Sequence, residues 1–333
     1  MRKFIWLLLG LALLYSAYWF IAARASESGI AAWLDTRQAE GWQSEYASLN
    51  TRGYPLTFET TLTDVAIADP LTGLAYQTSR ASIKSRSFTP TQLHAELAQD
   101  IRVSTPFQHI DFTNASAQGT LFVEVGPALT MHRATFDFDR LVAKSTLGWG
   151  FSLGHANATA LRQDDNRLAH DIQVTLTDLA PSAAMMARLN PNGILSDHFE
   201  AMTIDASVTF DKDWDITALE GPRPQPTHIE LRNMSAEWGA LDLRMAGAFD
   251  VDTRGYPTGK VALKATNWRE MVALATAAGI IPQNLENLIL RGGKMLAGLS
   301  GNANTIDAEL TLERGTISLG FLPLGPAPRI TIR

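Results

Sequence analysis

The side chains that could do chemistry in this 333-residue sequence are mainly histidines and carboxylates, and most are scattered. No two histidines stand three or four residues apart, so the paired helical ligands of an HExxH zinc site are absent. We interpret each histidine as a surface or turn residue and predict no metal site and no cofactor. A ligand set assembled only by the fold is the alternative. The seven are His94, His109, His132, His155, His170, His198 and His228.

Three aspartates alternate in the motif Asp211-Lys212-Asp213-Trp214-Asp215, which resembles the start of a calcium loop. An EF-hand loop needs glycine at its sixth position and glutamate at its twelfth. This chain has Ile216 and Pro222 there. We therefore predict a strand end with solvated acids.

Other catalytic patterns are also missing. Asp137 and Asp139 flank Phe138 on what reads as a strand, and we interpret the pair as its solvated face, although a buried pair could do acid–base work. Residues 298–302 lack the last glycine of a G-x-S-x-G elbow. The chain has no cysteine, which excludes disulfides, thiolate catalysis and Cys-ligated zinc. We predict that the protein is not an enzyme.

The N-terminal segment predicts a membrane anchor at residues 1–25. Twenty uncharged residues run from Phe4 to Ala23 after Arg2 and Lys3, and such a helix is about 30 Å long, the thickness of a bilayer's hydrocarbon core. The basic end predicts a cytoplasmic N-terminus. Aromatic rings near the far end are typical of the membrane interface. The residues we assign to the anchor are Phe4, Trp6, Tyr15, Tyr18 and Trp19.

A cleaved signal peptide is the alternative for this segment. Residues 23–25 read Ala-Arg-Ala, which has the small-x-small spacing of a cleavage site. The apolar run is longer than the roughly 7–15 residues of a signal peptide, and Trp19-Phe20-Ile21 places bulk beside the site. We favour the uncleaved anchor.

Residues 26–48 predict an amphipathic helix that caps a sheet, with the membrane surface as the other place for it. From about residue 47 the apolar period becomes two, most clearly at 171–177 and 202–210, which predicts ten to thirteen antiparallel strands. We divide them into β-rich units at 49–220 and 227–333, joined by the Pro-rich stretch 221–226, with one continuous domain as the alternative.

Local signals predict several irregularities. The alternation slips between Leu62 and Ile67, which indicates a bulge. Asp178 and Asn267 are placed to cap two helices, and the second stops near Gly279 and Pro282. A third helix is predicted from 283 to 290, ending at Gly292-Gly293. The motif Thr-Arg-Gly-Tyr-Pro occurs at 51–55 and at 253–257, which indicates either an internal repeat or convergent turns.

Apolar sheet faces are the positive clue to function. Beyond residue 23 the chain has 26 basic and 34 acidic side chains, a balance that argues against nucleic acid as a partner. An apolar face must be covered by helices, another sheet, lipid or a protein partner. Either a groove for acyl chains or a dry core satisfies the pattern. The candidate face is Ile204, Val208, Leu243 and Leu310.

Short motifs carry a family resemblance. The anchor, Gly53-Tyr54-Pro55 and the ending Leu-Gly-Phe-Leu-Pro-Leu-Gly-Pro-Ala-Pro at 319–328 resemble the bacterial family named domain of unknown function 2125. That resemblance implies an exported, membrane-tethered protein and carries no catalytic residue. More loosely, residues 261–319 are similar to AsmA-like envelope proteins. Some of those are implicated in moving or organising phospholipid along an apolar groove, but this chain is too short to span the periplasm alone.

Together these observations predict a mainly β fold with minor α: an N-terminal transmembrane helix followed by long antiparallel, AsmA-like β-sheet units with short covering helices. The expected location is the inner membrane of a Gram-negative bacterium, with the bulk in the periplasm. The expected function is non-enzymatic handling of membrane lipid. The alternative is a dry-core scaffold that binds another envelope protein. An enzyme would need polar groups that converge in one pocket.

Overall fold

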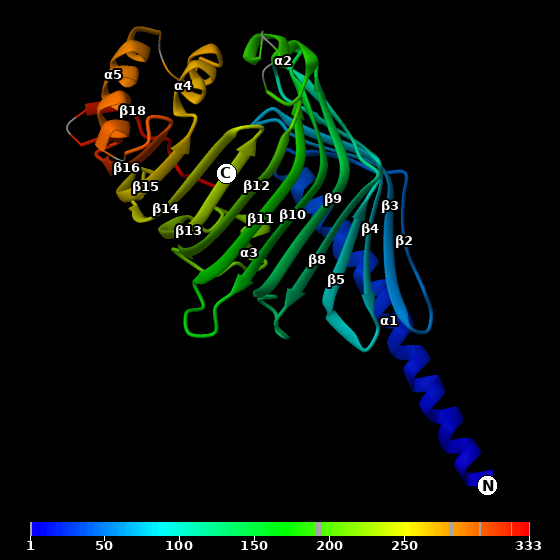
Figure 1. Cartoon of the computed structure of the whole chain (residues 1–333). Helices are drawn as coiled ribbons and strands as arrows, with labels where there is room; N and C mark the ends of the chain where they lie inside the picture. The colour runs from blue at the N-terminus through cyan, green and yellow to red at the C-terminus, as the bar shows by residue number, and fades with distance from the viewer. Residues whose placement is uncertain are drawn as a thin grey trace. The chain divides into compact units, whose positions relative to one another are not determined.

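The computed structural model of the chain describes residues 2–190, 193, 195–279, 281, 283–299, 301–320 and 322–332. A long N-terminal helix is followed by antiparallel strands and short helices (Figure 1). This confirms the predicted class, mainly β with minor α. The described residues form 18 strands, more than predicted, because several strands are only three to five residues long, too short to show alternation.

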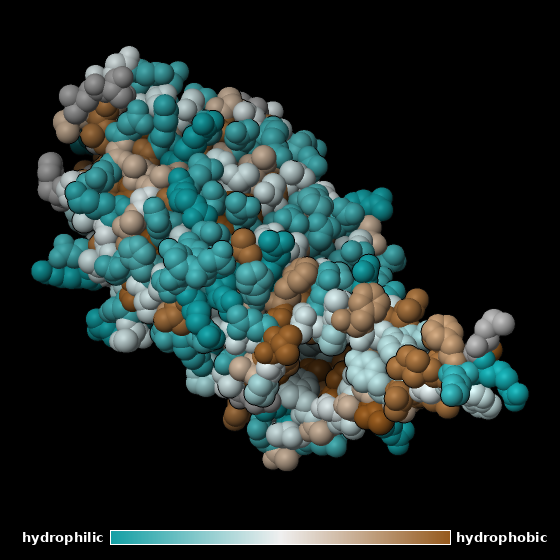
Figure 2. Space-filling model, turned by 90° about the horizontal axis from the view of Figure 1, so that it is seen from below, coloured by the Kyte–Doolittle hydropathy of each residue, from teal (hydrophilic) through white to brown (hydrophobic). Residues whose placement is uncertain are grey.

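The N-terminal helix α1 (Arg2–Ala39) is unbroken. The anchor and the amphipathic segment are therefore one helix, which ends at Ala39 rather than at residue 48. No proline interrupts the segment, and Gly41, at φ 96°, follows the end of the helix. Among the described residues, α1 is the one helix long and apolar enough to cross a membrane. Brown, apolar side chains gather over its N-terminal part at the right of Figure 2.

The chain divides into two compact units. The first unit contains Met1–Phe122 and Val142–Leu147, and the second contains Val123–Leu141 and Gly148–Arg333. The Pro-rich stretch 221–226, where the sequence places a boundary, lies inside the second unit.

The first unit combines α1 with short and long strands. β3 pairs with β1, β2 and β4, and β4 pairs with β5 along one half and with β6 along the other. The strands are β1 (Gln43–Glu45), β2 (Ser48–Arg52), β3 (Thr57–Asp69), β4 (Leu74–Arg86), β5 (Thr89–Leu97), β6 (Asp100–Ser104), β7 (His109–Thr113) and β8 (Ser116–Val123).

One contact and one backbone irregularity in the first unit bear on the sequence predictions. The second half of α1 covers β3, where Leu34 packs on Leu62 and Val65. The slip of alternation in β3 occurs at Asp64, which has φ 49°. The β3–β4 register is the same on both sides of Asp64, so the irregularity is a left-handed backbone residue and not the predicted bulge.

The second unit is largely a meander. From β10 to β18 each strand pairs antiparallel with the next. The strands are β9 (Met131–Ser145), β10 (Gly150–Arg162), β11 (Ala169–Pro181), β12 (Phe199–Phe210), β13 (Pro226–Trp238), β14 (Leu241–Val251), β15 (Pro257–Thr266), β16 (Thr305–Glu313), β17 (Thr316–Leu319) and β18 (Leu322–Pro326); β9 has residues in both units. The helices are α2 (Ala183–Leu189), α3 (Thr217–Glu220), α4 (Trp268–Ala277) and α5 (Gln283–Leu299).

Both copies of the five-residue motif end at hairpin turns, between β2 and β3 and between β14 and β15. Gly53 has φ 105° and Gly255 has φ 86°, a backbone region that favours glycine. An internal repeat and convergent turn chemistry would both produce this arrangement.

The predicted capping residues behave differently from expectation. Asp178 lies inside β11 at φ 55°, and α2 begins after Ser182, so the first cap prediction is wrong. Asn267 does precede α4, but at φ 56° and without a side-chain cap bond. Its Nδ2 donates to Ala240 O at 2.6 Å instead, which ties the helix start to the sheet. The sequence predicts that α4 stops near Gly279 and Pro282. Gly279 has φ 77°, and Pro282 lies outside the described residues.

Helix α5 runs through Gly292 and Gly293, where the sequence predicts its end. A Cβ on Gly293 would lie 2.5 Å from Cζ3 of Trp268. The glycine therefore allows close packing and does not terminate the helix. The sequence rule that glycine ends a helix does not hold here, because it takes no account of contacts with distant residues such as Trp268.

Gly293→Ala should destabilise α5 by about 1–3 kcal/mol, because the added methyl group overpacks the contact with Trp268. Gly298→Ala is the matched control in the same helix, since a Cβ at that position would have no atom within 4 Å. It should be neutral or stabilising by up to about 1 kcal/mol. Hydrogen exchange of residues 283–299 measures both, and equal protection in the two variants would contradict the packing role.

Candidate functional site

An apolar sheet face in the second unit carries all four residues of the predicted face. Ile204 and Val208 are four residues apart on β12 and so point to the same side. The register connects this side to Leu243 across β13, and then to β15 and β16. Leu310 stands four residues after Ile306 on β16, on the same side. The face is thus continuous across five strands.

One part of this face is closed. Val208 is buried in a packed cluster with its neighbours from β11, β12 and β13 and with two residues that lie outside these strands. Side chains here touch one another, as in a dry core. The members of the cluster are Ala206, Val208, Phe210, Ile172, Trp214, Ile229, Leu231 and Ile332.

The other part of the face lines a cavity of about 620 Å³. Leu243 and Leu310 lie in its wall, whereas Ile204 does not line it and is 37% exposed. Strands β11 to β18 contribute one side, and α2, α4 and α5 contribute the other. The residues that bound it are Pro181, Met185, Leu189, Phe199, Ala236, Trp238, Leu241, Leu243, Leu263, Ala265, Trp268, Met271, Val272, Leu274, Ala275, Ala278, Ile281, Ile289, Gly292, Gly293, Ile306, Ala308, Leu310, Leu319 and Leu324.

None of these lining residues is charged. The polar atoms of the two tryptophan rings are already bonded to backbone: Trp238 Nε1 donates to Ser196 O at 2.8 Å and Trp268 Nε1 to Ala303 O at 3.2 Å. A cavity of this kind offers a ligand no charge and little hydrogen bonding. It is suited to an apolar chain, and its volume falls within the roughly 300–1,000 Å³ of small-ligand pockets.

Helix α4 holds the wall in place through a small core. Trp268 is 2% exposed and packs with Val272, Ala297 and Ile306. Met271 packs against this core and also faces the cavity. Trp268, Val272 and Ile306 belong to this core and also line the cavity, so the core and the cavity wall are continuous.

The sequence predicts short covering helices but does not single out the aromatic residues of the cavity wall. Phe199 and Trp238 stack with ring centroids 4.3 Å apart, yet neither stood out in the alternation pattern. The lining residues of α4 include positions 268, 271, 272 and 275, which is the i, i+3, i+4, i+7 spacing of an apolar helix face. This spacing can be read from the sequence, and it indicates a helix with one apolar face that covers the sheet.

His170 is buried, so the prediction that every histidine lies on the surface or in a turn is wrong there. It is 1% exposed on β11, opposite Val208, and its ring meets Phe210 edge-on at 5.6 Å. Neither ring nitrogen has a well-formed hydrogen bond. Burial lowers the pKa of His170 below its usual 6.5, and the nearby Leu168 carbonyl only partly opposes this.

Below about pH 6.5 we expect His170 to reduce the stability of the second unit. The unfolded chain takes up a proton at the ordinary pKa of 6.5, whereas the fold holds the ring neutral, so stability is full above that pH and is lost as the pH falls. His170→Leu should flatten the loss of unfolding free energy between about pH 7.5 and 5.5. Hydrogen exchange of β11 measures it, and the exposed-site variant His228→Gln should keep the wild-type decline.

Asp137, Asp139 and His155 come together on the solvated side of β9 and β10. His155 Nδ1 lies 3.0 Å from Asp139 and Nε2 lies 3.4 Å from Asp137. The three offer metal-ligand atoms within 4.8 Å of one another. Each side chain is about two-fifths exposed or more. The arrangement is that of an exposed ion-pair cluster, as expected for a wet strand face.

The alternating aspartates after β12 do not converge on a common point. Each has its own protein partner instead: Asp211 accepts from Gln225 N, Asp213 pairs with Arg167, and Asp215 accepts from the Thr217 backbone and hydroxyl. This supports the solvated reading of that motif.

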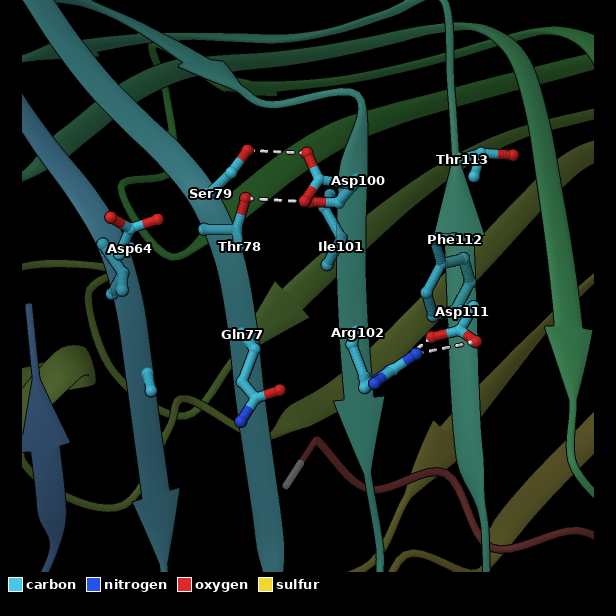
Figure 3. A pocket seen from close by; sticks show the side chains of 12 residues that line it. Asp64, Gln77, Thr78, Ser79, Asp100, Ile101, Arg102, Asp111, Phe112 and Thr113 are labelled. Carbon is cyan, nitrogen blue, oxygen red and sulfur yellow. Dashed lines mark hydrogen bonds and ion pairs between the residues drawn. The ribbon is translucent and has the colours of Figure 1, made fainter.

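A second hollow lies within the first unit, beside β3, β4, β6 and β7, and it is lined by polar and apolar groups together (Figure 3). Several of its polar groups are bonded to one another. Ser79 Oγ donates to Asp100 at 2.6 Å, and Arg102 holds Asp111 through two nitrogens. The guanidinium lowers the pKa of the Asp111 carboxyl below its usual range. These pairs join β4 to β6 and β6 to β7.

A family comparison covers most of the chain. The model of a family described as uncharacterized proteins conserved in bacteria, domain of unknown function 2125, matches residues 19–328. The chain belongs to this family. No curated protein and no solved structure matches the chain. The family assignment carries no ligand or reaction, so the function of this member must be argued from its cavity and its anchor. The looser resemblance to AsmA-like proteins is not shown and stays a prediction.

Proposed function

We propose that this family member is a non-enzymatic, membrane-anchored protein that holds an acyl chain of a lipid in the cavity of its second unit. The observation that carries the proposal is the cavity itself. Its walls are apolar throughout, and the polar atoms of Trp238 and Trp268 are bonded to backbone. A polar substrate would lose its hydration in such a place without gaining hydrogen bonds.

The proposed location follows from α1. Arg2 and Lys3 precede the apolar run and favour a cytoplasmic N-terminus, which would place both units in the periplasm beside the inner membrane. A protein tethered there meets lipid at high local concentration, so even a modest affinity would keep the cavity occupied.

The expected binding energy comes from desolvation of the chain. Each buried methylene contributes about 0.8 kcal/mol, so about ten of them contribute about 8 kcal/mol before the costs of association. The headgroup would remain outside, because the lining residues include no charged partner for it. We therefore expect selectivity for chain length rather than for headgroup.

Filling the cavity should abolish binding. In Leu243→Trp and Leu310→Trp the larger ring occupies the volume that an acyl chain needs, and we expect at least about a tenfold loss of affinity, or about 1.4 kcal/mol. The full chain in detergent micelles is titrated with a fluorescent fatty acid, and co-purified lipid is identified by native mass spectrometry.

Leu288→Trp is the matched control, because Leu288 lies on α5, is exposed and does not line the cavity. It should bind like the wild type. Circular dichroism and hydrogen exchange verify that all three variants are folded. Equal binding by folded Leu243→Trp, Leu310→Trp and wild type would contradict the proposal.

The closed cluster around Val208 favours a second function for that part of the face. A scaffold with a dry core that binds another envelope protein needs no cavity. A chain purified without lipid, which takes up no fatty acid, would support this alternative and direct the search to protein partners.

A further inference from the structure

Two turns of the first unit lie beside the middle of α1. They are the β2–β3 turn (residues 53–56) and the β4–β5 turn (residues 87–88), here called the rim. In Figure 1 the N-terminal part of α1 extends past the β2–β3 turn. Three ring groups of α1 donate to rim or adjacent backbone carbonyls: Tyr15 Oη to Pro55 O at 2.7 Å, Tyr18 Oη to Ser87 O at 2.9 Å and Trp19 Nε1 to Thr57 O at 3.0 Å.

The free part of α1 is too short to span a bilayer. Only residues 4–14 precede the rim contacts, a length of about 16 Å, whereas the hydrocarbon core is about 30 Å thick. The next charged residue after Lys3 is Arg24. A membrane that covers the apolar run from Phe4 to Ala23 must therefore also surround the level of the helix at which the rim is docked.

The rim is chemically suited to that position. It exposes large apolar side chains: Tyr54 is 51% exposed, Leu56 61% and Phe88 63%. At the same level α1 exposes Phe20 and Ile21, and Phe20 stacks on Tyr54. Exposed apolar side chains thus stand on both turns and on the adjoining stretch of α1.

Most carbonyls of the rim are bonded within the protein. Hydrocarbon leaves unpaired peptide groups several kcal/mol less stable, so turns enter it only when their polar groups are bonded within the protein. Gly53 O accepts from two backbone amides, and Leu56 O accepts from Ser87 N. The carbonyls of Pro55, Thr57 and Ser87 accept from the ring groups of α1.

Charge near the rim fits a phospholipid surface. Arg52, Lys84 and Arg86 stand at the strand ends beside the rim, together with one acid, Glu59, which lies opposite Arg52 and Lys84 in the strand register. All three cations are exposed. Long cationic side chains at this depth reach the phosphates of the interface while their stems stay in apolar surroundings.

From these observations we infer that the rim is embedded in the outer leaflet of the membrane that α1 spans, so that the first unit is partly immersed rather than held above the bilayer on a tether. The inference rests on the proposed anchoring by α1. It identifies the lipid hydrocarbon as the partner of Leu56 and Phe88. It also gives the Tyr15, Tyr18 and Trp19 hydrogen bonds a function, because they satisfy turn carbonyls that water cannot reach.

The chain has no cysteine, so single-cysteine variants can report depth directly. Leu56→Cys and Phe88→Cys in the full chain are labelled with an environment-sensitive fluorophore and reconstituted into vesicles of phosphatidylethanolamine and phosphatidylglycerol. Leu71→Cys is the control at the opposite, β3–β4 end of the same sheet, where Leu71 is 91% exposed. Leu14→Cys on α1 reports the anchor.

The expected result is a blue-shifted emission for the two rim sites and a loss of emission with lipids that carry a nitroxide on the acyl chain, as for Leu14. The Leu71 site should lose emission only with a water-soluble quencher. Rim sites that behave like Leu71 while Leu14 is quenched by lipid would overturn the immersion and leave the anchor intact. A Leu14 site accessible only from water would overturn the anchor as well.

Discussion

Trp268→Ala should destabilise the second unit by about 3–5 kcal/mol, the usual cost of truncating a buried tryptophan. Trp268 is 2% exposed and stands at the centre of the core beneath α4 and α5. The variant loses this packing and the hydrogen bond to Ala303 O. It also opens the cavity wall, so α4 and α5 should detach from the sheet.

Hydrogen exchange of residues 268–299 in the full chain measures this effect. Trp268→Phe separates the loss of packing from the loss of the hydrogen bond. Phenylalanine keeps much of the buried ring but removes the indole N–H donor. We expect it to cost about 1 kcal/mol for the lost hydrogen bond, plus the smaller ring volume. Protection of α5 that is unchanged in Trp268→Ala would show that the helices are held by other contacts. In Trp268→Ala we expect acyl-chain binding to fall together with the hydrogen-exchange protection of α5.

Trp19→Ala should have a comparable effect, about 3–5 kcal/mol, on the attachment of α1 to the first unit. Trp19 is 4% exposed, and it stacks on Phe58 at 5.5 Å between ring centroids. Its indole N–H also satisfies the carbonyl of Thr57. Without the ring, Phe58 becomes accessible and the Thr57 carbonyl loses its partner.

The measurement is hydrogen exchange of β2 and β3 with the full chain reconstituted in lipid nanodiscs. Trp6→Ala is the matched control in the same helix, because Trp6 is 70% exposed and lies outside the cluster that Trp19 forms with Phe58. It should leave exchange in β2 and β3 unchanged. Equal exchange in both variants would show that α1 is a simple tether. A chain cleaved after Ala25 would lose the same contacts as Trp19→Ala, which gives a physical reason to favour an uncleaved helix.

The sequence by itself determined the class of the fold and the candidate membrane span. Twenty uncharged residues in succession meet the length requirement of a bilayer whatever the rest of the chain does. Alternation at 171–177 and 202–210 reports one buried and one wet face, and the structure has β11 and β12 there. Both signals are local, so no tertiary information is needed to read them.

Only the tertiary structure decided what covers each part of the apolar face. Val208 and Leu243 belong to equally regular alternating strands, yet one lies in a closed cluster and the other lines a cavity. The difference arises from elements distant in sequence: Trp214 and Ile332 close one part, and α4 and α5 arch over the other. The predictions for Gly293 and His170 were wrong for the same reason, because close packing and burial are set by neighbours across the fold and not by residue type or spacing.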